Sequence, residues 1–552
     1  MLTFEQVVKA LALAAAIVVP GGFVLAIVLS RRGLRWTWAL LGIPAALPLG
    51  RHLLILPVWG ACLYASALGA GWHRQNLDRG ADFAEAARES LRIRDALLRR
   101  LRQRRIAREG WIKDDRLVLG ADRKGMPASM PIGYESGKHT LVLGATGAGK
   151  TVSEAWIACR LIEAGHGAVV VDPKGDQMLR EQLTLSAQRT GAAFMQWTPE
   201  GPLAYNPYAN GSETEIADKA LSGETFTEPH YLRQAQRYLG HAVRAMQAAG
   251  VGVTPVTLMA ALDPRELEVY TRNLSEQQSE QAQRYLDSLT ERQKRDLAGV
   301  RDRLSILAES DARAWLDPSE GRELLDLELA VRQRCVVYFR LDSDRRPLLA
   351  AMLAAAIVSD LIALVARLQA SPIPTVVMID EFSAVAAEHT ARLFGRARSA
   401  GISLILGTQE LVDLKSAGDG ALRDQTLGNV ATVIAHRQNV PESAELIAQM
   451  AGTTPRWIAT EQTATAMLGT AHSGRGSRRR GYEFHVHPSA IKQLGTGQAV
   501  VLTPGAGAPV IARVNHPAEA HAPRPERLAP LRALTGRLSS LAKNIHRPRR
   551  TP

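Results

Sequence analysis

Residues 144 to 151 read Gly-Ala-Thr-Gly-Ala-Gly-Lys-Thr, which completes the pattern G-x-x-x-x-G-K-[ST] directly after the apolar run 140–143. Backbone N–H groups of such a glycine-rich turn point inward at a polyphosphate, and the following helix adds its positive amino-terminal dipole. The residues after the turn, Val152 to Ala158, have a helical pattern, so the motif has the strand before it and the helix after it that it requires. The stretch therefore predicts a phosphate-binding loop.

The candidate nucleotide-binding residues are those of the loop: Gly144, Ala145, Thr146, Gly147, Ala148, Gly149, Lys150 and Thr151. We expect Lys150 to reach the β- and γ-phosphates and Thr151 to hold Mg2+ through its hydroxyl. The cofactors predicted by this motif are ATP and Mg2+. A glycine turn without a ligand is the alternative, and the strand and helix around the loop count against it.

A second apolar run, Thr375 to Ile379, ends in two carboxylates, Asp380 and Glu381. A short run of β-branched residues is typical of a buried parallel strand, which would present the acids at its carboxyl end. We expect Asp380 to bind in the Mg2+ shell and Glu381 to orient and deprotonate the attacking water. The acidic pair alone fits a solvated loop start better, but together with the phosphate loop it predicts an ATPase.

A third strand, Ile402 to Leu406, leads to Gln409, which we expect to touch the γ-phosphate or its attacking water. The preceding helix end carries Arg396 and Arg398. In a ring of subunits, one of them could reach a neighbour's γ-phosphate as an arginine finger. Arginines that cap a helix carboxyl end explain the same pattern equally well.

The long separation in sequence between the phosphate loop and the acidic pair indicates an insertion. Asp380 follows Lys150 by 230 residues, whereas strand–helix units of about 30 residues each would place them within about a hundred. From residue 212 to about 315 the chain is rich in Gln, Glu and Arg and has a helical pattern with almost no strand signal. The prediction is an α/β fold: a RecA-like P-loop nucleotide-binding domain with an inserted all-α subdomain and an N-terminal transmembrane helical anchor.

The expected parts follow from these patterns. They are a transmembrane anchor at 1–75, a basic membrane-proximal linker at 76–130, the nucleotide-binding domain at 131–211 and 322–515, the all-α insert at 212–321, and a flexible tail rich in Pro and Arg at 516–552.

Two uncharged stretches near the amino terminus are long enough to cross a bilayer. Ala10 to Ser30 has 21 residues and Leu53 to Trp72 has 20, and a bilayer core requires about 20. A signal peptide is disfavoured because Glu5 precedes the first stretch and a second one follows. A third uncharged run, Trp36 to Gly50, leaves two or three crossings open, and we expect two.

Charge and cysteine content narrow the class of partner and the compartment. The 552 residues carry a formal net charge of +13, which favours a polyanionic partner such as DNA or an anionic lipid surface. We interpret Arg475 to Gly481 as a basic loop that touches phosphates or is merely solvated. The cysteines Cys62, Cys159 and Cys335 are isolated, so we expect neither a disulfide framework nor a cysteine metal site, as suits a reducing cytoplasm.

Taken in order, these pieces resemble the type IV secretion coupling proteins of the TraG and TraD kind, within the larger group of FtsK- and HerA-like pumping ATPases. The matching pieces are the apolar hairpin, the loop 144–151, Val171–Asp176, Asn206–Pro207, the helical insert, Ile379–Phe382, Gly401–Gln409 and His487–Val501. The phosphate loop alone is shared by many unrelated enzymes, whereas the ordered set is specific. The short connection between the apolar runs departs from the family, whose members often carry a longer periplasmic loop there.

This resemblance implies a hexameric ATPase in the bacterial inner membrane, with its ATPase domain in the cytoplasm. It would recruit relaxase-bound single-stranded DNA or protein substrates, and feed them into a type IV secretion channel through its inner-membrane components. The resemblance also implies that the helical insert recognises the cargo and that Arg398, or else Arg396, acts in trans. The alternatives are an FtsK- or HerA-like double-stranded DNA translocase, and a receptor for protein effectors that does not pump DNA.

Overall fold

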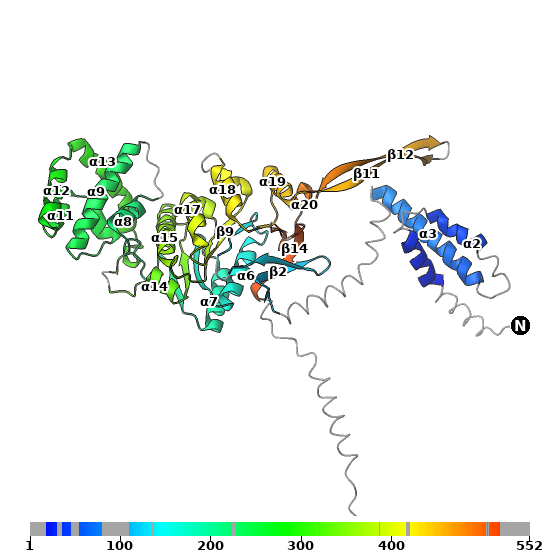
Figure 1. Cartoon of the computed structure of the whole chain (residues 1–552), viewed down its shortest axis with the longest axis horizontal. Coiled ribbons are helices and arrows are strands. Elements are labelled where there is room, and N and C mark those ends of the chain that lie inside the picture. Colours follow the sequence, from blue (N-terminus) through cyan, green and yellow to red (C-terminus); the bar gives the residue numbers. More distant parts are fainter. Residues whose placement is uncertain are drawn as a thin grey trace, which may run out of the picture. The chain divides into compact units, whose positions relative to one another are not determined.

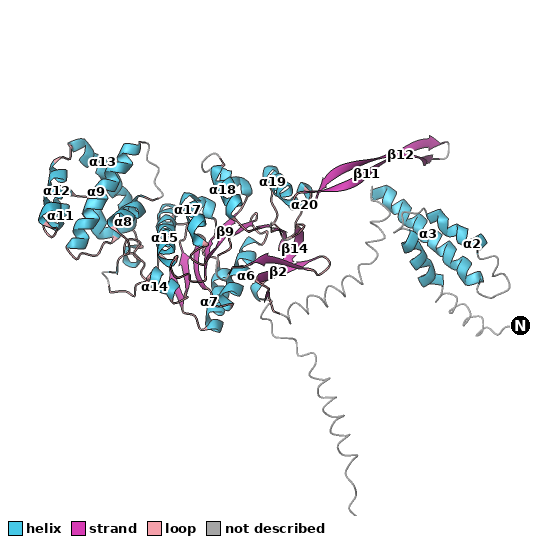
Figure 2. Ribbon diagram, viewed as in Figure 1, coloured by secondary structure: helices cyan, strands magenta, loops and turns pink. Residues whose placement is uncertain are grey.

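The computed structural model describes residues 18–29, 36–45, 55–79 and 110–518, apart from 134–136, 223–227, 319–320, 386, 416–419, 467–468, 504 and 506. The chain divides into two compact units, Met1–Arg105 and Ile106–Pro552. Figures 1 and 2 show the elements of each unit, which we describe separately. Residues 519–552, nearly all of the predicted tail, lie outside the described part of the chain.

The second unit is built on one mixed sheet. Its strand order is β1-β2-β14-β13-β10-β4-β9-β8-β5-β7-β6, and β3 pairs with β2. The strands from β10 to β6 are all parallel, and those from β10 through β13 and β14 to β2 are antiparallel. The bounds are β1 Ile112–Lys113, β2 Arg116–Asp122, β3 Pro127–Pro131, β4 Thr140–Leu143, β5 Gly167–Asp172, β6 Phe194–Trp197, β7 Val336–Arg340, β8 Thr375–Ile379, β9 Ile402–Thr408, β10 Thr432–Ala435, β13 Gln498–Leu502 and β14 Val510–Val514.

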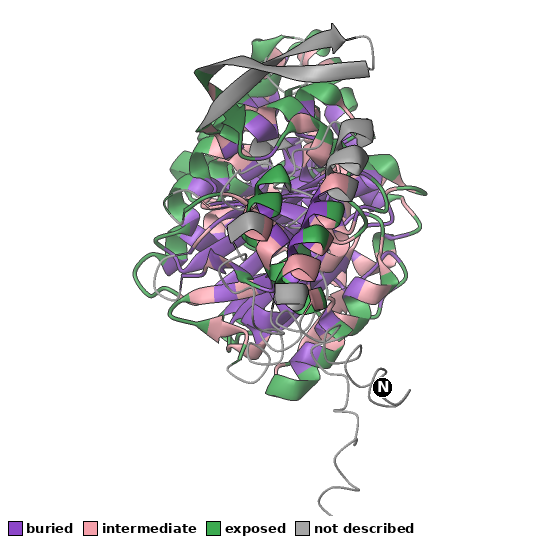
Figure 3. Ribbon diagram, turned by 90° about the vertical axis from the view of Figure 1, so that its right-hand side faces the viewer, coloured by how far each residue is buried: buried purple, intermediate pink, exposed green. Residues whose placement is uncertain are grey.

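Helices cover both faces of the parallel strands, which is why those strands are apolar at successive positions. In β5, Val169 and Val171 join one apolar core, whereas Ala168 and Val170 join the other. Figure 3 colours the residues by burial and shows the buried ones gathered in the interior, with exposed ones around them. The helices of the nucleotide-binding part are α6 Lys150–Glu163, α7 Gln177–Thr190, α14 Leu327–Arg332, α15 Pro347–Leu368, α16 Phe382–Val385, α17 Ala387–Ala397, α18 Ala421–Asn429, α19 Pro441–Ala451 and α20 Pro488–Lys492, with η5 at Leu411–Lys415. The prediction of an α/β fold is confirmed.

Only helices are described between β6 and α14, apart from one isolated bridge beside the strands. They are α8 Glu213–Leu221, α9 Pro229–Ala248, α10 Pro255–Ala260, α11 Pro264–Thr271, α12 Glu276–Asp287, α13 Glu291–Ala308 and η3 Arg313–Trp315. Local signals start several of them, since Ser212 and Thr290 form capping boxes with Glu215 and Gln293. Tyr238, Leu239 and other apolar residues of α9 are buried at the centre of this helical insert.

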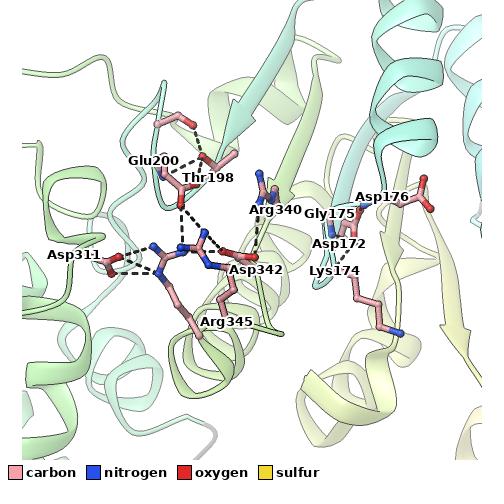
Figure 4. A network of polar contacts seen from close by, with 12 residues as sticks. Asp172, Lys174, Gly175, Asp176, Thr198, Glu200, Asp311, Arg340, Asp342 and Arg345 are labelled. Carbon is pink, nitrogen blue, oxygen red and sulfur yellow. Dashed lines mark hydrogen bonds and ion pairs between the residues drawn. The ribbon is translucent and has the colours of Figure 1, made fainter.

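Two groups of charged residues attach the insert to the nucleotide-binding part. Lys219 of α8 forms an ion pair with Asp360 of α15, and Asp360 also accepts a hydrogen bond of 2.6 Å from the Tyr205 hydroxyl. Figure 4 shows the second group, in which Glu200, Asp311 and Asp342 surround the arginines just before α15. Arg346, for example, donates to Asp342 at 2.7 Å and also contacts Asp311.

The strands β1 to β3 correct one predicted boundary. The sequence predicts a basic linker up to residue 130, but residues 112–131 belong to the sheet. Their pairing explains this, because β2 lies beside β14 with Gly120 opposite Val514, and Leu117 and Leu119 are fully buried. The nucleotide-binding part therefore begins about twenty residues earlier than predicted.

A second correction concerns the predicted basic loop. Residues 475–481 lie within β12, Gly469–Phe484, which pairs antiparallel with β11, Thr453–Ala466, in a separate two-stranded sheet. Cross-strand backbone hydrogen bonds hold this segment extended in spite of its Gly- and Arg-rich composition. Figure 1 shows the hairpin projecting beyond α19 and α20.

The first unit contains apolar helices that pack on one another. The helix Val18–Leu29 lies against α3, Ile55–Arg79, where Gly22 faces Ala61 and Tyr64. Of the residues between them, 36–45 are described and form η1, Trp36–Leu41, and α2, Gly42–Ala45. The carbonyl of Ile43 accepts a 3.0 Å hydrogen bond from the Trp59 indole. The predicted spans are only partly described, since residues 10–17, 30 and 53–54 lie outside these ranges.

One described helix has both the length and the apolar composition needed to cross a membrane, and it is α15 of the second unit. Two thirds of its most apolar window is buried, and Leu353, Ile357 and Leu361 belong to the core beside the sheet. The apolar helical stretches of the first unit, Val18–Leu29 and Val58–Ala70, are shorter than the 18 residues needed for a candidate span. Length and composition within the described residues thus leave the membrane anchor a prediction.

Candidate nucleotide-binding site

The loop 144–151 forms a tight turn between β4 and α6. Gly147 and Gly149 have φ angles of 74° and 110°, a left-handed conformation that glycine adopts without strain. Residues at the ends of the neighbouring strands hold the turn in place. The Gly144 N–H donates to the carbonyl of Thr408 at 3.2 Å, and the Ala145 N–H donates to that of Arg437 at 3.0 Å. This geometry places the start of α6 at the carboxyl end of β4.

A neighbouring segment closes over the loop from the side of the antiparallel strands. The Gly497 N–H donates to the carbonyl of Ala148 at 2.9 Å, and the Thr496 hydroxyl donates to that of Gly147 at 3.2 Å. Behind the loop, His436 at the end of β10 connects α6 to β13. Its Nδ1 lies 2.9 Å from the carbonyl of Gln498, so Nδ1–H is the donor and Nε2 accepts from the Ser153 hydroxyl at 2.8 Å.

Burial fixes the charge state of that histidine. His436 is fully buried, and burial lowers its pKa to about 4, although the carbonyl of Gln498 acts in the opposite direction. The imidazole is therefore neutral at physiological pH and serves as a fixed link between the phosphate loop and the sheet. Sequence analysis gives no indication of this residue.

The strand order brings the predicted site residues together. Because β4, β9, β8 and β5 are parallel neighbours, their carboxyl ends meet at one edge, as in other open α/β sheets. Lys150 contacts Asp380, and its Nζ lies 3.2 Å from Oε1 of Glu381. Gln409, just after β9, donates to the same Oε1 at 3.1 Å.

Glu381 is held by cations in a strained position. Its φ is 47°, a left-handed conformation that costs free energy in a residue other than glycine and is frequent at functional sites. Lys174 Nζ lies 3.0 Å from Glu381 Oε1. Burial raises the pKa of Glu381, but Lys150, Lys174 and the Gln409 amide more than offset it, so its pKa is lowered and the carboxylate is charged.

Lys174 belongs to a turn that Asp172 organises. Figure 4 shows Asp172 beside Lys174, Gly175 and Asp176. The Asp172 carboxylate accepts from the N–H groups of all three residues, at 3.0, 2.8 and 2.7 Å. It also accepts from the Tyr338 hydroxyl at 2.7 Å. The turn presents the Lys174 ammonium, to which the sequence assigns no role, at the edge that carries Glu381.

Asp380 and Lys150 influence each other strongly. Burial and the acids Glu381 and Asp172 raise the pKa of Asp380, against the effect of Lys150. Burial lowers the pKa of Lys150, but the acids Glu154, Asp380 and Glu381 raise it by more than burial lowers it. The pKa is therefore raised overall, and the ammonium is charged. Phosphate oxygens would compete with these carboxylates for the same cation.

Glu154 is a further acid of this site that the sequence does not single out. It lies one helical turn after Lys150 on α6 and is fully buried. Among the described residues, neither of its carboxylate oxygens has a hydrogen-bond partner. Burial first, and Asp380 second, raise its pKa well above the usual range of a glutamate. The spacing of four residues from Lys150 was the available signal.

The residues present fit Mg2+. A hard divalent cation prefers oxygen ligands and keeps several waters, and this edge offers the Thr151 hydroxyl, Asp380 and two further carboxylates. The buried, unpartnered oxygens of Glu154 also indicate a missing donor or cation close by. Thr151 and Asp380 are the residues that would hold the ion beside the phosphates.

The predicted arginines do not join this cluster. Arg398 follows α17, and its carbonyl accepts a 3.1 Å hydrogen bond from the N–H of Gly137, just before β4. This position is the amino edge of the parallel strands, opposite the phosphate loop. Arg396 and Arg398 are both exposed there. Only a second copy of the chain could bring either of them to a nucleotide, so their predicted role in trans stays a prediction.

Two family models match this chain. Residues 122–328 match the model described as the central domain of the helicase HerA, and residues 374–495 match the one described as the TraM recognition site of TraD and TraG. Both ranges include parts of the site, the first the phosphate loop and the second Asp380, Glu381 and Gln409. A search of curated proteins found no match.

Solved structures of a bacterial conjugative coupling protein have a similar fold. TrwB in a trigonal form with sulphate has a TM-score of 0.52 and 17% identity, over 75% of this chain and 91% of that one. TrwB in complex with the non-hydrolysable ATP analogue ADPNP has a TM-score of 0.51 and 17% identity, over 74% and 92%. At such identity the likeness shows the fold.

Proposed function

We propose that the chain is a coupling protein of the HerA-like P-loop ATPase group, which binds ATP with Mg2+ and uses hydrolysis to deliver cargo to a type IV secretion channel. The cargo is relaxase-bound single-stranded DNA, or protein substrates. The observation that carries the proposal is the meeting of Lys150, Asp380, Glu381 and Gln409 at one edge of the sheet.

Each residue at this edge has a chemical task in the proposed reaction. Bound Mg2+ would neutralise charge on the phosphates, and Thr151 and Asp380 position it. Lys150 leaves the carboxylates for the β- and γ-phosphates, which removes one cation from Glu381. The carboxylate then accepts a proton from water, while the Gln409 amide keeps its Oε1 oriented.

We further propose that the first unit anchors the protein in the bacterial inner membrane, with the second unit in the cytoplasm. The packing of Val18–Leu29 on α3 supports a hairpin of two spans. The third uncharged run, Trp36 to Gly50, has 15 residues, fewer than the about 20 that a span requires, and this supports two crossings over three.

The proposed working form is a homohexamer. Arg398, or Arg396, would reach the γ-phosphate of the neighbouring subunit, and its exposed position away from the chain's own site supports this role. The partners are the relaxase–DNA complex and inner-membrane components of the channel. The helical insert α8–α13 is proposed to recognise the cargo complex.

ATP hydrolysis by the full chain in detergent, measured with and without DNA, tests the proposal. We expect single-stranded DNA to stimulate turnover, and the stimulation to weaken with salt as phosphate contacts do. Stimulation by double-stranded DNA alone would instead favour a HerA-like duplex translocase, the reading that the match over residues 122–328 keeps open. Hydrolysis indifferent to any DNA would favour a receptor for protein effectors.

A further inference from the structure

The carboxylate of Glu154 is buried without a partner at the edge of the proposed ATP site. The side chain has no exposed surface, and neither oxygen meets a donor among the described residues. Two other polar residues of α6, Ser153 and Glu163, do have partners. Ser153 donates to His436 at 2.8 Å, and Glu163 forms an ion pair of 2.8 Å with Arg160.

Glu154 and Asp380 approach the same small space from different elements. Gly407 of β9 lies between them, and a Cβ atom there would overlap Oε1 of Glu154 and lie 2.7 Å from Oδ1 of Asp380. No hydrogen bond joins the two carboxylates in this structure. Two acids from α6 and β8 therefore border one point, and only a residue without a side chain leaves room for them at position 407.

A buried carboxylate without hydrogen bonds costs free energy, and an apolar residue of similar volume would fill the space without that cost. The acid therefore needs a donor that the described part of the chain does not supply. Water molecules bound to a divalent cation are strong donors, and Mg2+ keeps several of its waters when it binds to proteins.

We propose that Glu154 is a third carboxylate of the Mg2+ site, where it accepts hydrogen bonds from metal-bound water together with Asp380. This inference rests on the proposed function, because it requires Mg2+–nucleotide at the same edge. Glu154 acts through water and through Asp380, so it is a positioning residue. Loss of such outer partners typically weakens metal affinity by about 10- to 100-fold.

Binding of a fluorescent ADP analogue to the full chain in detergent, titrated with Mg2+, measures this role without hydrolysis. Glutamine has the shape of a neutral carboxyl group but replaces one acceptor oxygen by a donor. We expect Glu154→Gln to raise the Mg2+ concentration for half-maximal binding about 10-fold or more. Nucleotide affinity in EDTA should not change. Glu163→Gln, on the same helix, is the matched control and should behave as the wild type.

The outcomes separate this inference from the proposed function. An unchanged Mg2+ requirement in a folded Glu154→Gln variant means that the acid only fills space, and overturns the inference. If that variant fails to fold, Glu154→Asp decides, since it keeps the carboxyl group but withdraws it by one methylene. An unchanged requirement there also overturns the inference. If the wild type binds nucleotide without any Mg2+ dependence, both proposals fail.

Discussion

Two buried charge clusters of this protein differ in how completely their groups are paired. At the junction between α8 and α15, the Lys219 ammonium contacts Asp360 and the carbonyl of Asn210, and Asp360 also accepts from Tyr205. Every charged group of this junction cluster has a protein partner.

At the carboxyl edge of the sheet, three acids are instead incompletely paired, although both Lys150 and Lys174 contact Glu381. Lys150 contacts Asp380 and Glu381, while Glu154 has no partner among the described residues. Glu381 is also held at a strained φ of 47°. We call the fully paired junction cluster the closed cluster, and it holds two parts of the fold together. The incompletely paired cluster of Lys150, Asp380, Glu381 and Glu154 is the open cluster, and it requires charge from a ligand. This contrast distinguishes a structural from a functional set of buried charges.

Substitution of Glu381, the proposed base of the open cluster, should leave the protein folded but remove most of its ATP hydrolysis. We expect Glu381→Gln to lower ATP turnover by about 10²- to 10⁴-fold, the usual contribution of a positioned general base. Nucleotide affinity and thermal stability should stay close to the wild type, because the amide keeps the shape of the side chain. Steady-state hydrolysis and analogue binding measure these effects. A variant with wild-type turnover would exclude Glu381 as the base.

The closed cluster should respond in the opposite way. Lys219→Met leaves Asp360 buried without its cation, so we expect a loss of about 3–5 kcal/mol in the free energy of unfolding. Urea denaturation of the full chain measures this loss. The double variant Lys219→Met, Asp360→Leu should recover most of it, because no uncompensated charge remains. A loss below about 1 kcal/mol would mean that the junction cluster is not a structural fastening.

A smaller effect should come from His436, whose closed hydrogen-bond chain supports the phosphate loop. Its pKa is about 4 in the folded protein and near 6.5 when unfolded. Between these pH values the unfolded chain therefore binds a proton that the folded protein does not bind. Stability should therefore fall as the pH falls from 6.5 to 4, by up to about 3 kcal/mol from this residue. His436→Gln should flatten the dependence of the thermal midpoint on pH within this window. An unchanged dependence would contradict a buried neutral imidazole.

The adjacency of the predicted site residues followed from the sequence because it depends on local patterns. Apolar runs before Lys150, Asp380 and Gln409 indicate parallel strands, and parallel strands place their carboxyl ends together. Glu154 could be placed only on the helix face of Lys150. The space that Gly407 leaves beside it depends on packing between α6 and β9, which no local pattern encodes.

The two errors of the fold prediction have a common cause. The strand β2 is held by β14 from the far end of the described chain, and β12 is held by its pairing with β11. Such pairing between strands overrides local composition, including the Gly- and Arg-rich stretch 475–481. Local residue patterns contain no information about a distant partner strand. They therefore favour a linker up to residue 130 and a loop at 475–481.

Cargo transfer by a variant of the phosphate loop tests the central claim most directly. Lys150→Ala removes the cation that would hold the β- and γ-phosphates, while the first unit is unchanged. Transfer from donor cells that carry this variant in place of the wild type is compared at equal amounts of membrane-inserted protein. The account predicts that transfer is abolished together with ATP turnover. Transfer at the wild-type level would contradict an ATP-driven coupling protein.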